Sequence, residues 1–230
     1  MKYRILGPGG PRVSTIALGT MTWGEQNTQA QAHEQLNVAL EAGINFIDTA
    51  EMYPVPPQPL TQGRTETYIG QWLCERPSRR DQIVLASKAA GPTRTAARPS
   101  HVRAGRLSFN STNLTEAVND SLKRLQTDYL DLYQLHWPDR STNYFGEMNY
   151  RHVADEETIA IEETLAALAQ LIRAGKIRHI GVSNETPWGV ARFLQAANTE
   201  GLPRILTIQN PYNLVNRIFE IGLAEFAMRD

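Results

Sequence analysis

The sequence is poor in cysteine and has no long apolar run. Its single cysteine, Cys74, cannot form a disulfide within the chain, which fits a reducing cytoplasm. No stretch of about 18 apolar residues occurs, so a membrane-spanning helix is not expected. The segment Met1–Gly10 carries two basic residues with no apolar segment behind them, so it does not resemble a secretory signal. We therefore expect a cytoplasmic protein that does not contact membranes.

An excess of either charge is also lacking. The 230 residues include 23 Lys and Arg against 24 Asp and Glu, a net charge of −1. Nucleic-acid binding proteins need a basic face to displace counterions from phosphates, so we expect no nucleic-acid partner. The five histidines form no pair at the helical spacing typical of metal ligands, and we expect no metal site. Hydrophobic residues make up 41% and charged residues 20%, as in an ordinary globular protein.

Short apolar runs alternate along the chain with longer segments of helical periodicity. The runs are Thr15–Leu18, Asn45–Ile47, Ile83–Ala86, Tyr129–Leu135, His179–Val182 and Ile205–Ile208. The helical segments follow five of these runs and are centred on Leu40, Ile69, Val118, Leu168 and Phe193. No linker or low-complexity tract divides the chain, so we expect one domain over residues 1–230. Strict alternation predicts a parallel sheet whose strands are covered on both faces.

Several residues predict where the elements begin and end. Asn113, with Glu116 three residues later, has the spacing of a capping box before Leu114. Thr186 followed by Pro187 predicts a second helix start. Gly43 and Gly175 are expected just beyond helix ends. Before the first unit, Lys2–Leu6 and Arg12–Val13 flank a glycine- and proline-rich turn and predict a small β-hairpin.

Alternation alone fits either an open dinucleotide-binding sheet or a closed barrel. The dinucleotide fingerprint is missing, because Gly7, Gly9 and Gly10 lie in a turn bounded by prolines and do not open a helix after a strand. A barrel is therefore the favoured interpretation. In such a barrel the reactive groups project from the carboxyl ends of the strands.

Every predicted strand ends there in a polar group or a flexible glycine. In strand order the residues are Gly19, Thr20 and Met21; Asp48 with Tyr53 beyond it; Lys88; His136; Ser183 and Asn184; and Gln209. Any one of these residues could simply be a solvent-exposed polar residue at a strand end. An Asp, Tyr, Lys and His together at one rim instead favour a site that delivers a proton to a carbonyl. A tyrosine hydroxyl is a poor acid until a cation lies beside it. Lys88 can supply that cation and Asp48 can hold the ammonium.

Reduction of a carbonyl also requires that the substrate is oriented and that a hydride donor is bound. His136 can orient the carbonyl oxygen of a substrate. Since this set provides no electrons, reduction needs a bound hydride donor, which Ser183, Asn184 and Gln209 could hold by hydrogen bonds to a carboxamide.

Three further features have more ordinary interpretations. Cys74 is expected to be a small buried side chain next to Leu73. Residues 91–108 contain four arginines and no acid, and are expected to form a solvated loop, with a phosphate or acidic-substrate contact as the alternative. Tyr144, Phe145 and Tyr150 lie in another long loop that could contribute to a substrate lid.

Five stretches carry a resemblance to a known family. They are GINFIDTAEMY, IVLASK, SLKRLQTDYLDLYQLHWP, RAGKIRHIGVSNE and TIQNPYNLVNR, and together they resemble the aldo-keto reductases. The insert PVPPQPLTQGRTE is most similar to the bacterial Tas branch of that family. The resemblance covers the chain from the hairpin to its last residue, and it implies a (β/α)8 TIM barrel that uses NADPH to reduce small-molecule aldehydes and ketones.

The resemblance also implies residue roles. Asp48, Tyr53, Lys88 and His136 match the catalytic tetrad, with Tyr53 as the proton donor. The positions that match cofactor contacts are Gly19, Thr20, Met21, Asp48, Ser183, Asn184 and Gln209. Trp23 and Trp137, together with Tyr53 and His136, match the substrate pocket, although packing at the rim is an alternative for the two tryptophans.

The sequence accounts for about six of the family's eight strand–helix units. Either it is a fragment of a longer protein, or something else closes the barrel. We expect the two open edges to favour self-association, because an edge strand exposes unpaired backbone groups. A non-catalytic binding or regulatory subunit with a reductase-like barrel is the alternative function.

Overall fold

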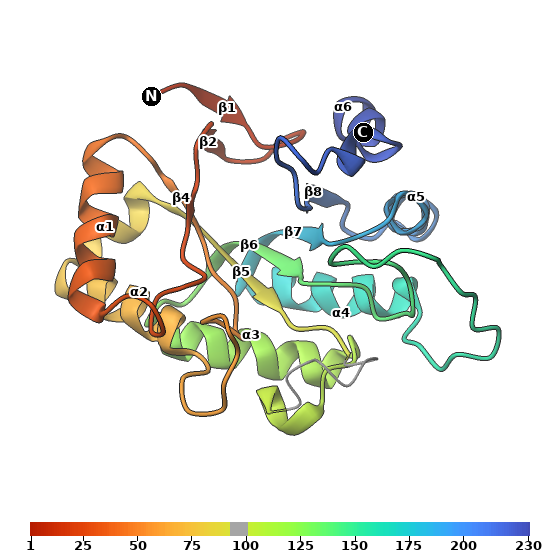
Figure 1. Ribbon diagram of the computed structural model, residues 1–230, viewed down its shortest axis with the longest axis horizontal. Helices are drawn as coiled ribbons and strands as arrows, with labels where there is room; N and C mark the ends of the chain where they lie inside the picture. The colour runs from red at the N-terminus through yellow and green to blue at the C-terminus, as the bar shows by residue number, and fades with distance from the viewer. Residues whose placement is uncertain (93–100) are drawn as a thin grey trace.

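The computed structural model describes residues 1–92 and 101–230 and contains a curled parallel sheet with helices along its outer face (Figure 1). The six strands follow one another across the sheet in chain order, from β3 to β8. Their bounds are β3 Leu18–Gly19, β4 Phe46–Asp48, β5 Val84–Ala89, β6 Leu130–Leu135, β7 Ile177–Ser183 and β8 Ile205–Gln209. The expected α/β fold with six strand–helix units of a (β/α)8 barrel is confirmed.

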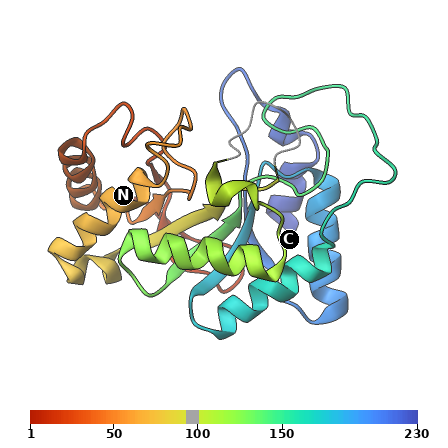
Figure 2. The same cartoon turned by 90° about the horizontal axis from the view of Figure 1, so that it is seen from below.

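The helices lie on the convex side of this sheet (Figure 2). They are α1 Gln29–Glu41, α2 Arg64–Glu75, α3 Ser111–Leu125, α4 Ile161–Arg173, α5 Pro187–Glu200 and α6 Leu223–Arg229. Three short 3₁₀ segments, η1 Pro77–Gln82, η2 Val102–Gly105 and η3 Ile218–Glu220, lie in the connections. In the part of the chain that the structure describes, none of the helices has the length and apolar character needed to cross a membrane.

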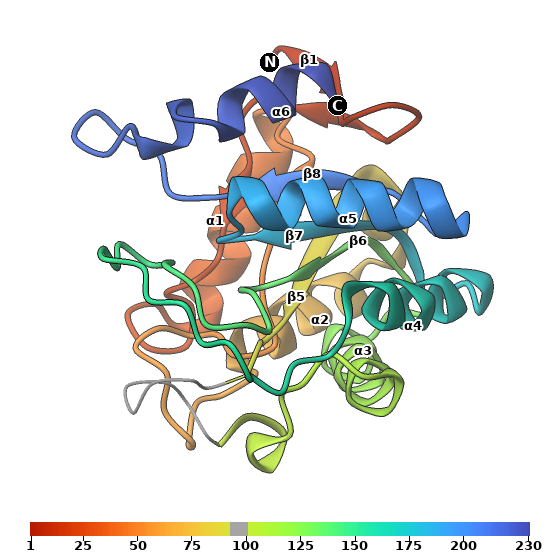
Figure 3. The same ribbon diagram turned by 90° about the vertical axis from the view of Figure 1, so that its right-hand side faces the viewer.

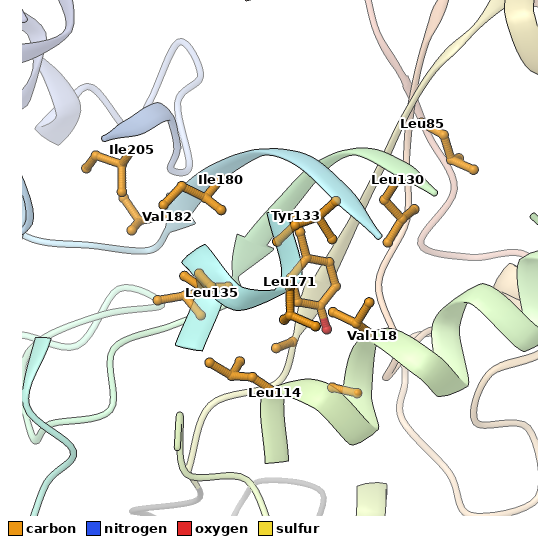
Figure 4. Close-up of a cluster of buried hydrophobic side chains, with 14 of the residues drawn as sticks. Leu85, Leu114, Val118, Leu130, Tyr133, Leu135, Leu171, Ile180, Val182 and Ile205 are labelled. Atoms are coloured by element: carbon orange, nitrogen blue, oxygen red, sulfur yellow. The ribbon is translucent and has the colours of Figure 1, made fainter. Parts of the chain in front are cut away.

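The main core fills the space between the outer face of the sheet and the helices (Figure 4). Leu85, Tyr133 and Ile180 come from neighbouring strands, and Leu114 and Val118 of α3 pack against them. These side chains are almost completely buried. Because side chains alternate along a strand, the residues between them point to the concave side. Ser87 thus bonds Glu66 of α2, whereas its neighbour Lys88 bonds Asp48 on the opposite face.

The predicted N-terminal hairpin is present as β1 Tyr3–Ile5 and β2 Arg12–Ser14. It closes one end of the sheet, beside the amino ends of the strands (Figure 3). The Ser14 amide donates to Asn45 Oδ1, directly before β4. At the other side of the sheet the hairpin turn approaches Leu206 of β8 so closely that a Cβ added to Gly10 would lie 2.8 Å from its side chain. The hairpin therefore acts as a plug at the end opposite the polar rim.

Most of the predicted element boundaries are confirmed, and one is wrong. Thr186 caps α5 through a bond from the Gly189 amide, and Gly43 and Gly175 have the expected positive φ. The capping residue of α3 is not Asn113. Asn110 accepts from the Asn113 amide at 2.9 Å, so α3 begins one turn earlier. The apolar periodicity begins only at Leu114 because the first turn of the helix is polar.

The prediction that Cys74 is buried is also wrong. Cys74 is an exposed free thiol in the last turn of α2. Trp72 and Leu73 direct their side chains into the core and are almost completely buried. The next residue is rotated about 100° further around the helix axis. That rotation carries Cys74 out of the buried face.

Candidate active site

Four polar side chains converge at the carboxyl end of the sheet. Asp48 is the last residue of β4, Lys88 lies in β5, and His136 follows β6 directly. Tyr53 is in the loop after β4, where its carbonyl accepts from the Gly63 amide at 2.8 Å. The register pairs Asp48 with Ala86, and Lys88 with Gln134, so these parallel strands present their side chains at similar depth. The structure thus brings all four predicted catalytic residues together.

Lys88 connects the members of this group. Its Nζ lies 2.7 Å from Asp48 Oδ2, 2.8 Å from the Thr49 carbonyl and 3.4 Å from the Tyr53 hydroxyl. The Lys88 side chain is 1% exposed. Burying an ammonium is costly unless it is paired and hydrogen-bonded, and these contacts provide both. Lys88 therefore presents a fixed positive charge to the phenol oxygen.

Two glutamine amides hold the Asp48 carboxylate from further sides, and only one of these glutamines was predicted as a site residue. Gln134 Nε2 donates to Asp48 Oδ1 at 3.3 Å, and Gln209 Nε2 donates to Asp48 Oδ2 at 3.2 Å. The two glutamines also bond each other at 3.0 Å. Gln209 was predicted for the cofactor site, but Gln134 was not predicted for any role. One feature of the sequence indicated Gln134: it is an amide residue within an apolar run, two residues before His136 and so on the same face of the strand.

Burial and charge set the acidity of the central groups. Burial raises the pKa of Tyr53 above its ordinary value; Lys88 lowers it and Asp48 raises it. Burial by itself lowers the pKa of Lys88, but the combined attraction and hydrogen bonds of Asp48 and Tyr53 raise it overall. Lys88 therefore stays an ammonium, and it is the group that makes the buried Tyr53 a stronger acid.

His136 completes the group from the side of β6. Its ring lies 5.6 Å from the Tyr53 ring, edge to face, and its amide donates to the Ala89 carbonyl at 2.9 Å. The Nδ1 atom is buried without a hydrogen-bond partner among the described residues. Burial, and secondly Lys88, lower the pKa of His136 well below its ordinary value. A neutral imidazole can donate one hydrogen bond to a carbonyl oxygen but adds no positive charge.

The depressed pKa of His136 makes the stability of the protein depend on pH. In the unfolded chain the imidazole binds a proton near pH 6.5, whereas the folded protein resists protonation. The neutral His136 therefore makes its full contribution to the free energy of unfolding above about pH 6.5. This contribution is lost as the pH falls from there toward the pKa of His136 in the folded protein. One proton gives a slope of up to about 1.4 kcal/mol per pH unit.

Replacement of the imidazole tests this dependence. We expect wild type to lose more free energy of unfolding than His136→Gln when denaturant melts at pH 8 are compared with melts at pH 5.5. Equal losses in the two proteins would contradict a neutral His136.

A cavity of about 610 Å³ opens beside the four residues. Tyr53, Lys88 and His136 line it on one side. Its remaining wall is mostly apolar or amide-bearing: Met21, Met52, Val55, Pro57, Trp137, Phe145, Glu147, Ser183, Asn184, Gln209, Asn210 and Pro211. A few convergent polar groups in an apolar cavity are typical of a small-molecule site.

Ser183, Asn184 and Gln209 form one side of this cavity. Ser183 Oγ donates to the Gln209 carbonyl at 2.8 Å, and Asn184 Nδ2 donates to the His136 carbonyl at 2.9 Å. Asn184 has φ +52°, an uncommon conformation for a residue other than glycine, and its fixed backbone aims the amide at this site. A hydroxyl and two amide side chains line the same cavity as Tyr53, and groups of this kind can hydrogen-bond the carboxamide of a nicotinamide ring.

The three predicted cofactor residues at the end of β3 and directly after it differ in placement. Met21 lines the cavity and is partly exposed. Thr20 is fully buried, and its hydroxyl donates to the Asp48 carbonyl at 2.8 Å, which joins the end of β3 to β4. A Cβ added to Gly19 would meet no atom within 4 Å among the described residues. Thr20 therefore has a structural role here, while Met21 faces the cavity.

The two predicted pocket tryptophans are separated. Trp137 lines the cavity, lies 5.0 Å from the His136 ring and is 1% exposed. Trp23 is equally buried but belongs to the main core, where it packs with residues of α1 and α2. Its Nε1 donates to Gln35 Oε1 at 3.0 Å. The described residues that line the cavity do not include Trp23, which fits the alternative of packing.

We predicted a solvated loop at residues 91–108, and this prediction is wrong for Arg103. The Arg103 side chain is 4% exposed and makes two bonds to the buried Glu51 carboxylate. Arg106 is exposed and pairs with Glu116. Arg94 and Arg98 lie outside the described residues. No local pattern predicts this pairing, because Glu51 and Arg103 are 52 residues apart in the sequence.

The loop after β6 contributes Phe145 and Glu147 to the cavity. Phe145 is half exposed and lies 5.8 Å from the Trp137 ring. Tyr144 is buried with Trp137 in a second, smaller cluster, and Tyr150 is exposed and lines a different pocket. Phe145 is thus the aromatic residue of this loop that faces the candidate site.

Comparison with known proteins identifies the family of this chain. Residues 15–230 match the model of the aldo/keto reductase family. "Protein tas" of Escherichia coli strain K12 is 54% identical over 228 residues, covering 98% of this chain and 64% of that protein. "Aldo-keto reductase YhdN" of Bacillus subtilis strain 168 is 34% identical over 99% of this chain and 58% of its own length. "Norsolorinic acid reductase stcV" of Emericella nidulans is 34% identical over 95% of this chain and 52% of its own. The chain therefore spans between about half and two thirds of the length of these relatives.

Proposed function

The chain belongs to the aldo/keto reductase family, and from that premise we propose that it reduces aldehydes or ketones to alcohols with NADPH as the hydride donor and Tyr53 as the proton donor. The observation that carries this proposal is the contact of the Tyr53 hydroxyl with Lys88 Nζ at 3.4 Å, with Asp48 2.7 Å beyond. A phenol next to a fixed cation, in a cavity wide enough for a small molecule, is suited to general-acid catalysis.

Each residue has a definite part in this reaction. His136 donates a hydrogen bond that orients the carbonyl oxygen toward Tyr53. Tyr53 gives its proton to that oxygen as negative charge develops there, and Lys88 stabilises the resulting phenolate. Asp48 holds Lys88, and Gln134 and Gln209 hold Asp48. Met52, Val55 and Trp137 provide an apolar wall for the substrate.

The residues at the carboxyl ends of β7 and β8 would hold the cofactor. Ser183, Asn184 and Gln209 have the hydroxyl and amide groups that a nicotinamide carboxamide requires, and they line the same cavity as Tyr53. When bound, NADPH supplies the hydride. Ser183 and Asn184 would hold its carboxamide in the cavity that Tyr53 and His136 also line.

Titration of the purified protein with NADPH and with NADH, followed by fluorescence, tests cofactor binding. Ser183→Ala removes one neutral hydrogen-bonding group, which contributes about 0.5–1.5 kcal/mol. We expect this variant to raise the Kd for NADPH by about 2–12-fold. Ser111→Ala, at the start of α3 and remote from the cavity, is the matched control and should bind as wild type does.

Consumption of NADPH in the presence of simple aromatic and aliphatic aldehydes then tests turnover. Tighter binding of NADH than of NADPH would contradict the proposed cofactor. Binding of NADPH without turnover of any carbonyl would favour the alternative, a reductase-like binding or regulatory subunit.

A further inference from the structure

Glu51 is a buried carboxylate that the proposed reaction does not use. It is 1% exposed and lies between Asp48 and Tyr53 in the loop after β4. Its amide donates to the Lys88 carbonyl at 3.2 Å, and its Oε1 accepts from the Ala90 amide at 2.6 Å. The two contacts of Glu51 therefore lie on either side of Ala89, the last residue of β5. Its own carbonyl accepts from Gln62 Nε2 at 2.6 Å, which fixes the loop from the other direction.

Arg103 neutralises this carboxylate and extends the same contact. Its Nη2 lies 2.9 Å from Glu51 Oε1 and its Nε lies 3.0 Å from Glu51 Oε2, a bidentate geometry. The same Nη2 donates to the Ala90 carbonyl at 3.2 Å. Burial raises the pKa of Glu51, whereas Arg103 and the Ala90 amide lower it, so the charged carboxylate depends on these partners. Arg103 itself has φ +45°, so the backbone of η2 adopts an uncommon conformation at this contact.

We propose that Glu51, clamped by Arg103, is a positioning residue that sets the distance between the Lys88 ammonium and the Tyr53 hydroxyl. This inference rests on the proposed function, because the distance matters for proton donation by Tyr53. Neither Glu51 nor Arg103 is among the residues that line the described part of the cavity, so the pair acts through Lys88 and Tyr53.

The geometry explains why the clamp is needed. The Lys88–Tyr53 contact, at 3.4 Å, is at the long limit of a hydrogen bond, so a small displacement of either residue breaks it. Lys88 belongs to a strand, whereas Tyr53 belongs to a loop. Glu51 joins the two, since it is two residues before Tyr53 and bonds the strand at Lys88 and Ala90. Among the described residues, the charged or titratable groups that face Tyr53 are Lys88 from β5, Asp48 from β4 and His136 after β6. Glu147, from the loop after β6, lines the same cavity.

Variants of the pair test the proposal by kinetics. Glu51→Gln keeps the shape but places an amide against the guanidinium, and Arg103→Met removes the cation. We expect each to lower kcat at least tenfold, while the KM for the carbonyl and the Kd for NADPH change less than twofold. Arg103→Lys keeps the charge without the bidentate geometry and should give an intermediate kcat. Arg106→Met, in the exposed Arg106–Glu116 pair of the same segment, is the matched control and should leave kcat unchanged.

A second measurement does not require turnover. The ultraviolet absorbance of tyrosinate, taken as the difference between each protein and its Tyr53→Phe counterpart, reports the titration of Tyr53 alone. Because Lys88 lowers the pKa of Tyr53, moving the ammonium away should shift this titration to higher pH in Glu51→Gln and Arg103→Met. It should stay in place in Arg106→Met.

The outcomes separate this inference from the proposed function. An unchanged Tyr53 titration together with an unchanged kcat in the two variants would overturn the positioning role. A shifted titration in a protein that reduces no carbonyl would support the clamp while rejecting the proposed reaction. If either single variant fails to fold because one buried charge is left unpaired, the double variant Glu51→Gln/Arg103→Met removes both charges. The same two measurements then apply to it, with the same expected and contradicting results.

Discussion

Tyr53→Phe is expected to abolish carbonyl reduction while the protein still binds NADPH. The substitution deletes only the hydroxyl that lies 3.4 Å from Lys88 Nζ, and the ring keeps its edge-to-face contact with His136. Loss of a positioned general acid lowers a rate by about 10²–10⁴-fold. The measurement is the initial rate of NADPH oxidation with an aldehyde, together with the Kd for NADPH.

A second tyrosine provides the matched control for this variant. Tyr133 is completely buried in the main core, and its hydroxyl has no hydrogen-bond partner in the described parts of the chain. Tyr133→Phe therefore removes the same atom without leaving another group unsatisfied, and it should retain the wild-type rate. A Tyr53→Phe protein with half the wild-type rate would show that Tyr53 is not the acid.

Lys88→Met is expected to slow the reaction by about 10²-fold or more and to move its alkaline limb to higher pH. Donation requires protonated Tyr53, so the rate falls as the pH rises through the pKa of that phenol. Burial raises this pKa, Lys88 lowers it, and Asp48 raises it. Removing the ammonium leaves only the two raising influences, so the pKa increases and the phenol becomes a weaker acid. The measurement is kcat from pH 6 to pH 11.

Lys88→Met is also expected to lower the stability of the protein, and this effect has to be measured separately from the effect on catalysis. Asp48 would lose its buried counter-ion, and breaking such a pair costs about 3–5 kcal/mol. Gln134 and Gln209 still donate to the carboxylate, which favours the lower end of that range. The double variant Asp48→Asn/Lys88→Met removes both charges and should fold more stably than the single one. Lys176→Met, at an exposed lysine that bonds Asn119, is the control and should change neither rate nor profile. A wild-type pH profile in folded Lys88→Met would remove Lys88 from the mechanism.

The order of the strands and helices could be predicted from the sequence because it follows from local patterning. The apolar runs at Tyr129–Leu135 and Ile205–Ile208 lie within one residue of β6 and β8. Boundaries were less accurate where the first turn of a helix is polar, as at Asn110, or where the chain bends early. Only Leu18 and Gly19 form a strand in the first unit, whose predicted run was Thr15–Leu18.

The candidate site could be predicted at the positions where a polar residue follows a strand. Asp48, His136 and Ser183 were found in this way, since parallel strands place their carboxyl ends at one edge. Gln134 escaped the same reasoning because it lies within a strand, and a polar side chain there is visible only once the concave face is known. The family resemblance implied a pocket position for Trp23, with packing as the alternative, and the path of the chain after β3 places this side chain in the core.

The sequence by itself determined the alternation of elements, the family resemblance and the chemical types at the rim, because these depend on residues close together in the chain. Only the tertiary structure decided which charges are paired. Glu51 with Arg103, Gln134 with Asp48, and Gln209 with Asp48 are separated by 52, 86 and 161 residues. Such pairs form only when the sheet curls and brings distant strands around one concave face. A buried charge needs a partner on that face, and local sequence patterns do not predict which distant residue it is.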